Sequence, residues 1–289
     1  TLVKGEGAID EERIIKGMVG RELTDRFPKR ENVAIGEVSM EIKNWNVYHP
    51  LYTERKVVDN VSLTVHKGEV VGISGLMGAG RTELAMSVFG KSYGTNISGE
   101  LYINNEKVEL HNPKQAIDKK LAYVTEDRKG NGLILSNPIR VNTTLANLGD
   151  VSNRSVIDKD KEIAVASEYK EKLKTKCPTI EQNVGNLSGG NQQKVLLAKW
   201  MYADPDVLIL DEPTRGIDVG AKYEIYCIIN NLVAEGKSVI MISSELPEIL
   251  GMCDRIYVMN EGKMVGELSR EEATQEVIMS HILSSSKGE

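Results

Sequence analysis

The fold is decided by residues 70–89, which read VVGISGLMGAGRTELAMSVF. The opening residues form a short apolar run, which is typical of a strand buried on both faces of a parallel sheet. A glycine-rich stretch follows, and after it residues 83–89 have a helical pattern. Because glycine lacks a Cβ atom, its backbone turns tightly and lets a ligand approach closely. The segment therefore predicts a strand that leads through a tight loop into a helix.

The loop matches the phosphate-binding pattern G-x-x-x-x-G-K-[ST], except that Arg81 stands where lysine is expected. In such a loop the backbone N–H groups point at phosphate oxygens, and the N-terminus of the following helix adds partial positive charge. We expect the hydroxyl of Thr82 to bind Mg²⁺. The predicted phosphate-binding residues are Gly75, Gly78, Ala79, Gly80, Arg81, Thr82 and Glu83. The alternative is a glycine-rich turn that binds no ligand.

A second motif joins four apolar residues to two carboxylates in the sequence VLILDEP at 207–213. It predicts a buried strand whose C-terminal edge carries Asp211 and Glu212, and ligands of open α/β sheets bind at this edge. We expect Asp211 to hold Mg²⁺ through water and Glu212 to act as the general base toward an attacking water. The alternative is a strand that ends in a solvated acidic turn.

Further patterns indicate an α/β fold. Apolar and polar residues alternate at 37–43 and 61–65, and Asn104-Asn105 marks a hairpin turn, so an antiparallel β portion is expected. Further buried strands are predicted from short apolar runs at 121–124, 207–210, 239–242 and 256–259. An apolar stripe between 221 and 232 predicts a helix. Strands and helices that alternate in this way predict a doubly wound, mixed or parallel sheet.

The composition narrows the classes of function. The 289 residues include 36 Lys+Arg and 42 Asp+Glu, so the net charge is -6. This balance speaks against general nucleic-acid binding, for which a basic patch is the expected footprint. No uninterrupted apolar stretch approaches the roughly 18 residues that a membrane span needs. We therefore expect any membrane role to pass through a partner.

Residues 187–194 read LSGGNQQK and begin another helix, with Ser188 as a natural N-cap. Two glycines beside a helix N-terminus make an anion site. Placed between the phosphate loop and the acidic strand, this motif resembles the LSGGQ signature of ABC-transporter ATPases. The resemblance extends from about residue 34 to about residue 265. It implies a P-loop NTPase of the ABC ATPase type that works as a pair. The residues that would close on the γ-phosphate held by the partner domain are Ser188, Gly189, Gly190 and Gln192.

The resemblance also assigns residues outside these motifs. Asp218, in the sequence GID at 216–218, would couple the two sites of the pair. Tyr48 resembles the aromatic residue that stacks on adenine. Tyr52 is the competing candidate, and an ordinary surface or core tyrosine is the alternative. The implied cofactors are ATP and Mg²⁺.

Three positions depart from the usual family pattern. Arg81 replaces the P-loop lysine, Glu126 stands where a glutamine is usual, and Ser244 stands where the switch histidine is expected. Arginine is larger and planar, so its fit around the phosphates differs from that of lysine. Glu126 would act on Mg²⁺ through water, and Ser244 cannot take the cationic role of a histidine. We therefore expect a catalytic set of Glu212, Ser244 and Glu126 that hydrolyses ATP slowly.

Taken together, the departures resemble one subgroup, the second of two tandem ATPase halves in bacterial sugar-import ABC proteins of the ribose, galactose and xylose type. The motifs that carry this resemblance are GAGRT at 78–82, EDRK at 126–129, LSGGNQQK at 187–194, DEPTRGID at 211–218 and SSE at 243–245. The segment at 45–50, which ends in His49-Pro50, is most similar to the xylose or multiple-sugar members.

The same resemblance implies a domain organisation. Residues 1–33 would be a tail or linker from a preceding ATPase half, and a simple N-terminal extension is the alternative. Residues 34–289 would form the nucleotide-binding domain, with a helical subdomain at about 127–195. We expect the segment 132–147 to contact a permease, the alternative being an ordinary loop of the helical subdomain.

The expected function is to energise import of a monosaccharide, such as xylose or several sugars, by binding and hydrolysing ATP. The implied partners are the first ATPase half or a second copy, membrane permease subunits and, indirectly, a periplasmic sugar-binding protein. The implied location is the cytoplasmic face of the cell membrane. One alternative is a nucleotide-gated module with little or no hydrolysis. The other is a soluble ABC ATPase that is not coupled to transport.

Overall fold

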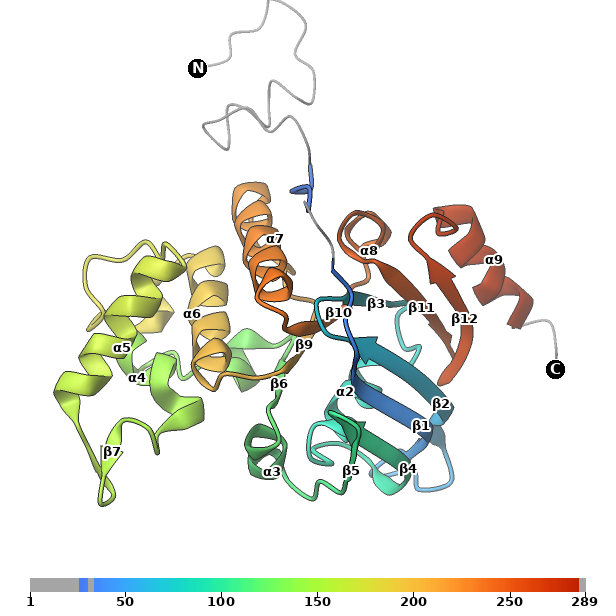
Figure 1. The fold of residues 1–289 in the computed structure, drawn as a ribbon, viewed down its shortest axis with the longest axis horizontal. Helices are drawn as coiled ribbons and strands as arrows, with labels where there is room; N and C mark the ends of the chain where they lie inside the picture. The colour runs from blue at the N-terminus through green and yellow to red at the C-terminus, as the bar shows by residue number, and fades with distance from the viewer. Residues whose placement is uncertain (1–25, 31–33, 286–289) are drawn as a thin grey trace, which may run out of the picture.

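The computed structural model describes residues 26–30 and 34–285, and its centre is a six-stranded sheet with the strand order β12-β11-β3-β10-β9-β6 (Figure 1). Neighbouring strands from β11 to β6 are parallel, and β12 runs antiparallel to β11. The strands are β3 (Val70–Gly75), β6 (Leu121–Val124), β9 (Val207–Asp211), β10 (Ser238–Ile242), β11 (Arg255–Asn260) and β12 (Lys263–Ser269). Each of the five predicted apolar runs is one of the parallel strands.

The helices explain why these strands show no polar alternation. Every residue of β6, β9 and β10 is buried, because helices pack against the sheet and leave no solvated face. The helices are α2 (Arg81–Val88), α3 (Pro113–Asp118), α4 (Ile139–Thr144), α5 (Lys159–Lys172), α6 (Gly189–Tyr202), α7 (Val219–Ala234), α8 (Leu246–Met252) and α9 (Gln275–Ser285). Among the described residues, no helix is both long enough and apolar enough to cross a membrane.

A second, antiparallel sheet lies beside the first, and α2 contacts strands of both. Its strands, in spatial order, are β2 (Lys56–His66), β1 (Val38–Tyr48), β4 (Thr95–Ile103) and β5 (Glu106–Val108). Asn104 and Asn105 connect β4 to β5, and both have positive φ angles, 49° and 64°. Such angles at both central residues are those of a type I′ hairpin turn. The predicted antiparallel portion and the α/β fold class are therefore confirmed.

A helical region lies at one end of the sheet, at the left of Figure 1. In it α4 packs against α5 and α6, and the short hairpin of β7 (Ser152–Asn153) and β8 (Val156–Ile157) projects from it. The predicted subdomain at 127–195 contains α4, α5 and the first half of α6. Because α6 also contacts β6 and α7, this helix joins the helical region to the central sheet.

Residues 26–30 lie across α7 and α8. The ring centroids of Phe27 and Tyr226 are 5.3 Å apart, and the Asn230 side chain donates a hydrogen bond of 3.1 Å to the Pro28 carbonyl. Arg30 forms an ion pair with Asp254. This part of the predicted linker at 1–33 is thus attached to the body, and the residues 1–25 and 31–33 lie outside the described residues.

The contact between Phe27 and α8 can be tested at Gly251. A Cβ atom at this position would lie 2.4 Å from the Phe27 ring, so Gly251→Ala is expected to destabilise the fold by about 1–3 kcal/mol. In a Phe27→Ala background the same change should be neutral or stabilising by up to about 1 kcal/mol, because alanine favours helix over glycine. Urea unfolding measures both, with Gly149→Ala, where a Cβ meets nothing within 4 Å, as the control. An equal cost of Gly251→Ala in both backgrounds would contradict the packing.

Candidate functional site

The candidate site is built where three parallel strands end together. Ile242 of β10 pairs with Asp211 of β9 on one side and with Ile73 of β3 on the other. The loops that follow these strands therefore leave the sheet at the same edge. This register brings together the glycine-rich loop, the two carboxylates at the end of β9 and the serines after β10, at the edge where α/β proteins bind ligands.

The glycine-rich loop turns sharply into α2 at Gly80. This residue has a φ of 95°, and a Cβ atom there would lie 2.5 Å from the Val57 carbonyl oxygen. A left-handed conformation and so close an approach of β2 both require glycine. The turn leaves Arg81 as the first residue of α2 and Thr82 as the second, so both follow directly from the predicted loop.

Asp211 and Thr82 form a pair that fits a Mg²⁺ ion. The Tyr123 hydroxyl donates a hydrogen bond of 2.9 Å to the Asp211 Oδ2 atom, and the Thr82 side chain lies close enough to the carboxyl to lower its pKa. The Oδ1 atom is buried and has no hydrogen-bond partner among the described residues. A hydroxyl oxygen beside a carboxylate with a free oxygen matches the hard oxygen ligands that Mg²⁺ prefers. Sequence reasoning missed Tyr123, whose only signal was a hydroxyl within an apolar run.

Burial of Asp211 has an electrostatic consequence. Burial raises the pKa of this carboxyl, while Thr82 and the hydrogen bond from Tyr123 oppose the rise. The neighbouring carboxylates Glu126 and Glu212 repel its charge and add to the rise, and the resulting pKa is about 6. A bound cation would relieve this repulsion, which is a second reason why the cluster fits a divalent metal.

Glu212 is held in an unusual backbone conformation. Its φ is 48°, in the left-handed region that non-glycine residues rarely adopt, and such strain is typical of functional sites. The carboxylate accepts two hydrogen bonds from Ser244, one from the backbone N–H at 2.7 Å and one from the hydroxyl at 3.2 Å. Burial raises the pKa of Glu212, while Ser244 and the charge of Arg81 lower it in part. A carboxylate with a raised pKa is suited to accept a proton.

Arg81 reaches across the site instead of lying along the loop. Its guanidinium donates a hydrogen bond of 2.7 Å to the Ser243 carbonyl, and its Nη2 atom lies 3.9 Å from the Glu212 carboxylate. The side chain is only 9% exposed. The longer arginine thus places its charge between the phosphate loop, the candidate base and the segment after β10. Three of the residues predicted from separate motifs, Arg81, Glu212 and Ser244, meet here.

Glu126 lies in a segment that is tied to the chain after Glu212. Its carboxylate forms an ion pair of 2.9 Å with Arg215. Nearby, the Arg128 guanidinium donates hydrogen bonds to the carbonyls of Arg215 and Gly216, at 2.7 and 3.3 Å. The loop at 126–129 is therefore linked to the segment that precedes α7, and Glu126 is already paired with a cation.

The glycines of the LSGG motif allow a close approach of elements. A Cβ atom at Gly190 would lie 2.5 Å from the Ala221 Cβ, and one at Gly189 would lie 2.9 Å from the Arg128 guanidinium. Ser188 occupies the N-cap position of α6, but its side chain does not cap the helix; its hydroxyl accepts a bond from the Asn191 amide. The predicted N-cap position of Ser188 is therefore confirmed, although no hydrogen bond from its side chain caps the helix.

The remaining predicted residues have structural partners of their own. Gln192 is 4% exposed, and its amide donates to the carbonyls of Val184 and Leu187, so it supports the turn before α6. Asp218 caps α7 by accepting the Ala221 N–H at 2.9 Å.

Two tyrosines remain candidates for the adenine contact. Tyr48 pairs with Lys56 where β1 ends and β2 begins. The residue after Lys56 is Val57, whose carbonyl oxygen lies close to Gly80 of the phosphate loop. The Tyr48 ring lies 5.7 Å from the Lys56 ammonium. Tyr52 is 68% exposed in the loop that joins β1 to β2. The adenine contact stays a prediction for both residues.

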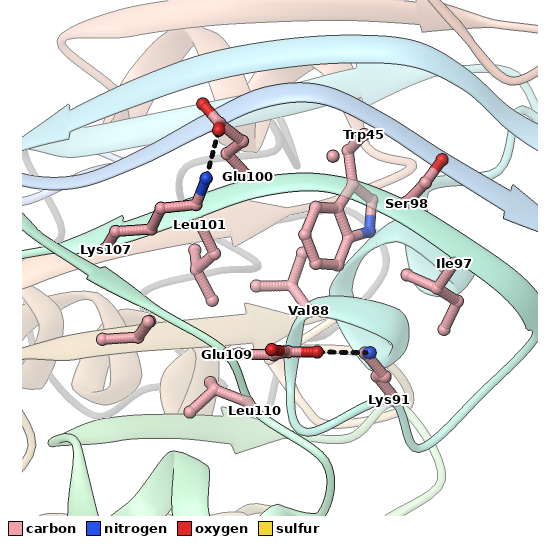
Figure 2. A pocket seen from close by; sticks show the side chains of 12 residues that line it. Trp45, Val88, Lys91, Ile97, Ser98, Glu100, Leu101, Lys107, Glu109 and Leu110 are labelled. Atoms are coloured by element: carbon pink, nitrogen blue, oxygen red, sulfur yellow. Dashed lines mark hydrogen bonds and ion pairs between the residues drawn. The ribbon is translucent and has the colours of Figure 1, made fainter.

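A cavity of about 500 Å³ lies between β4, β5 and the end of α2 (Figure 2). Trp45 and other apolar side chains form its wall, and the ion pairs Lys107–Glu100 and Lys91–Glu109 flank it. Since its described lining contains none of the predicted site residues, this cavity is separate from the site at the sheet edge.

The fold and the site together define a P-loop domain of the ATP-binding cassette class, and comparisons with known proteins agree. The family model described as ABC transporter matches residues 58–215. The chain therefore belongs to the ABC transporter family.

Individual relatives and structures resemble the chain over most of its length. It is 61% identical over 96% of its length to an L-arabinose transport ATP-binding protein of Geobacillus stearothermophilus, covering 54% of that protein. It is 54% identical over 93% of its length to a xylose import ATP-binding protein of Thermoanaerobacter pseudethanolicus, covering 53%. The chain thus spans about half the length of these relatives. A dimeric ATP-binding cassette bound to ADP and Pi superposes with a TM-score of 0.69 at 22% identity, over 80% of this chain and 98% of that one.

The electrostatics of Asp211 give a pH prediction. Because its pKa is raised to about 6, Mg²⁺-dependent ATP binding should weaken as the pH falls through this value, where protonation removes the negative charge. Titration calorimetry with and without Mg²⁺ measures the effect. In Asp211→Asn the gain in affinity from Mg²⁺ should be small at every pH. This variant also corrects for protonation of ATP itself, which affects both proteins equally. A Mg²⁺ effect in Asp211→Asn as large as in the wild type would contradict the assignment.

Proposed function

We propose that this chain binds Mg-ATP at the edge of its central sheet and hydrolyses it to energise import of a monosaccharide. The observation that carries the proposal is the meeting of Thr82, Asp211 and Glu212 at one sheet edge behind a glycine-rich loop. These groups supply a phosphate cradle, two metal-binding oxygens and a base, which are the parts that phosphoryl transfer requires.

In the proposed mechanism the loop and the N-terminus of α2 hold the phosphates through backbone N–H groups. Thr82 and Asp211 would hold Mg²⁺, which when bound would neutralise negative charge on the phosphates. Glu212 orients the attacking water and accepts its proton, and Ser244 fixes the carboxylate through its two hydrogen bonds. Arg81, which lies beside the Ser243 carbonyl and Glu212, would supply positive charge toward the phosphates. Glu126, which is paired with Arg215 in this structure, would hold the metal through water if that ion pair opened.

The proposed working unit is a pair of ATPase domains. The free N-terminus of α6, with Ser188, Gly189 and Gly190, would face the ATP of a partner domain, and Asp218 would lie at the same interface. A dimeric cassette of the same fold supports this arrangement. The partner is a preceding half of the same protein or a second copy of this chain. The chain's match to about half of each relative favours the first.

The proposed substrate class and location follow from the relatives. These relatives are named for transport of L-arabinose and import of xylose, so the cargo is proposed to be a pentose or a similar monosaccharide. The domain would act at the cytoplasmic face of the cell membrane, together with permease subunits that receive sugar from a periplasmic binding protein. The segment 132–147 is the proposed permease contact, and Ile134, which is 42% exposed, supplies apolar surface there.

One observation favours a second candidate function, a nucleotide-gated module with little hydrolysis. Both oxygens of the Glu212 carboxylate are engaged by Ser244, and Arg81 lies 3.9 Å away. If these contacts persist when ATP binds, they weaken Glu212 as a base because they lower its pKa, and ATP binding alone would drive closure of the pair.

Glu212→Gln separates the two functions. As a base, Glu212 contributes on the order of 10²- to 10⁴-fold to the rate, so the variant should lose ATPase activity by about this factor while it still binds ATP. Phosphate release measures turnover and calorimetry measures binding. If the wild-type protein binds ATP but releases no phosphate, and Glu212→Gln behaves in the same way, the result would instead favour the nucleotide-gated module.

A further inference from the structure

Glu248 is a buried carboxylate outside the predicted site. It belongs to α8 and is 1% exposed. A buried carboxylate destabilises a protein unless hydrogen bonds and a counter-charge compensate it. The structure provides both. The groups that contact its oxygens are the hydroxyls of Thr214, Tyr226 and Ser243 and the ammonium of Lys222.

The donors come from different parts of the chain. Tyr226 donates at 2.6 Å and Lys222 at 3.1 Å, both from α7. Ser243, directly after β10, donates at 2.8 Å to the Oε2 atom. Thr214, two residues beyond Glu212, donates to the Oε1 atom. One carboxylate therefore ties together the two segments that follow β9 and β10.

These two segments position the candidate base. Ser244 donates both hydrogen bonds that the Glu212 carboxylate accepts, and the Ser243 carbonyl accepts the Arg81 guanidinium. A displacement of residues 243–244 would therefore move both hydrogen bonds of the Glu212 carboxylate at once. Glu248 holds this segment through Ser243, and it holds the segment that follows Glu212 through Thr214.

The carboxylate of Glu248 is ionised at neutral pH. Burial alone would raise its pKa, but the hydrogen bonds from Thr214 and Tyr226, the charge of Lys222 and the bond from Ser243 outweigh burial and lower it. A charged acceptor forms stronger hydrogen bonds than a neutral one, and a fully satisfied buried network is rigid.

We propose that Glu248 is a positioning residue, which fixes Glu212, Ser244 and Arg81 relative to one another without touching ATP. This inference rests on the proposed function for its catalytic consequence. Its structural part, that Glu248 holds the segment at 243–244, is independent of whether the site hydrolyses ATP.

Glu248→Gln and Glu245→Gln form a matched pair of variants. Both remove one carboxylate that pairs with Lys222, but Glu245 is exposed and its side chain does not bind Thr214, Tyr226 or Ser243. A glutamine at 248 brings an NH₂ group against these donors and leaves some of them unpaired. Misplacement of a catalytic group costs up to about 100-fold in rate. Glu248→Gln should therefore lower kcat about 10- to 100-fold with little change in KM for ATP, and Glu245→Gln should resemble wild type.

Hydrogen exchange supplies a readout that needs no activity. In the nucleotide-free protein, amides at 243–245 should exchange faster in Glu248→Gln than in Glu245→Gln, because the Ser244 N–H loses its fixed partner. If Glu248→Gln does not fold, Ser243→Ala replaces it, since this variant removes one donor and keeps the charge. Unchanged exchange in a folded Glu248→Gln, or equal effects of both glutamine variants, would overturn the proposal. If the wild type shows no ATP turnover but the amides still exchange faster in Glu248→Gln, the positioning role is supported, and only the proposed ATP hydrolysis is refuted.

Discussion

The register of three parallel strands is the constraint on which the site depends. β3, β10 and β9 are adjacent, and Ile242 pairs with both Ile73 and Asp211. Because side chains alternate along a strand, a shift of one residue would turn the Asp211 side chain toward the opposite face. The apolar strands thus do more than fill the core. They fix the level at which the glycine-rich loop, the carboxylates and the serines emerge.

Charge at this edge is unusually dense for a buried region. Asp211, Glu212 and Glu248 are carboxylates with little or no exposure, and Arg81 and Lys222 are the cations that face them. Carboxylates so close together raise one another's pKa unless cations or hydrogen bonds compensate them. Arginine at position 81 suits this arrangement, because it is long enough to reach the Ser243 carbonyl while its charge stays near Glu212.

Much of the fold and part of the site could be predicted from sequence because their signals are local. One apolar run predicted β6 with its exact bounds, and Asn104-Asn105 predicted the hairpin between β4 and β5. Both signals are local, because hydrophobic patterning and turn chemistry depend on few neighbouring residues. Tyr123 and Glu248 were missed, because their roles come from partners far along the chain, such as Asp211 and Thr214. Likewise, no local pattern indicates that Arg81 will extend from the glycine-rich loop to the Ser243 carbonyl, which follows β10.

Binding of Mg-ATP to this chain tests the central claim most directly, and Gly78 offers a matched pair of variants. It has a φ of 81°, and a Cβ atom there would meet nothing within 4 Å. Asparagine and aspartate both tolerate this conformation, but only aspartate adds a negative charge where phosphates should lie. Calorimetry should show saturable Mg-ATP binding for the wild type and Gly78→Asn, and none or far weaker binding for Gly78→Asp. Equal binding by both variants, or none by the wild type at millimolar ATP, would contradict a working phosphate site in this loop.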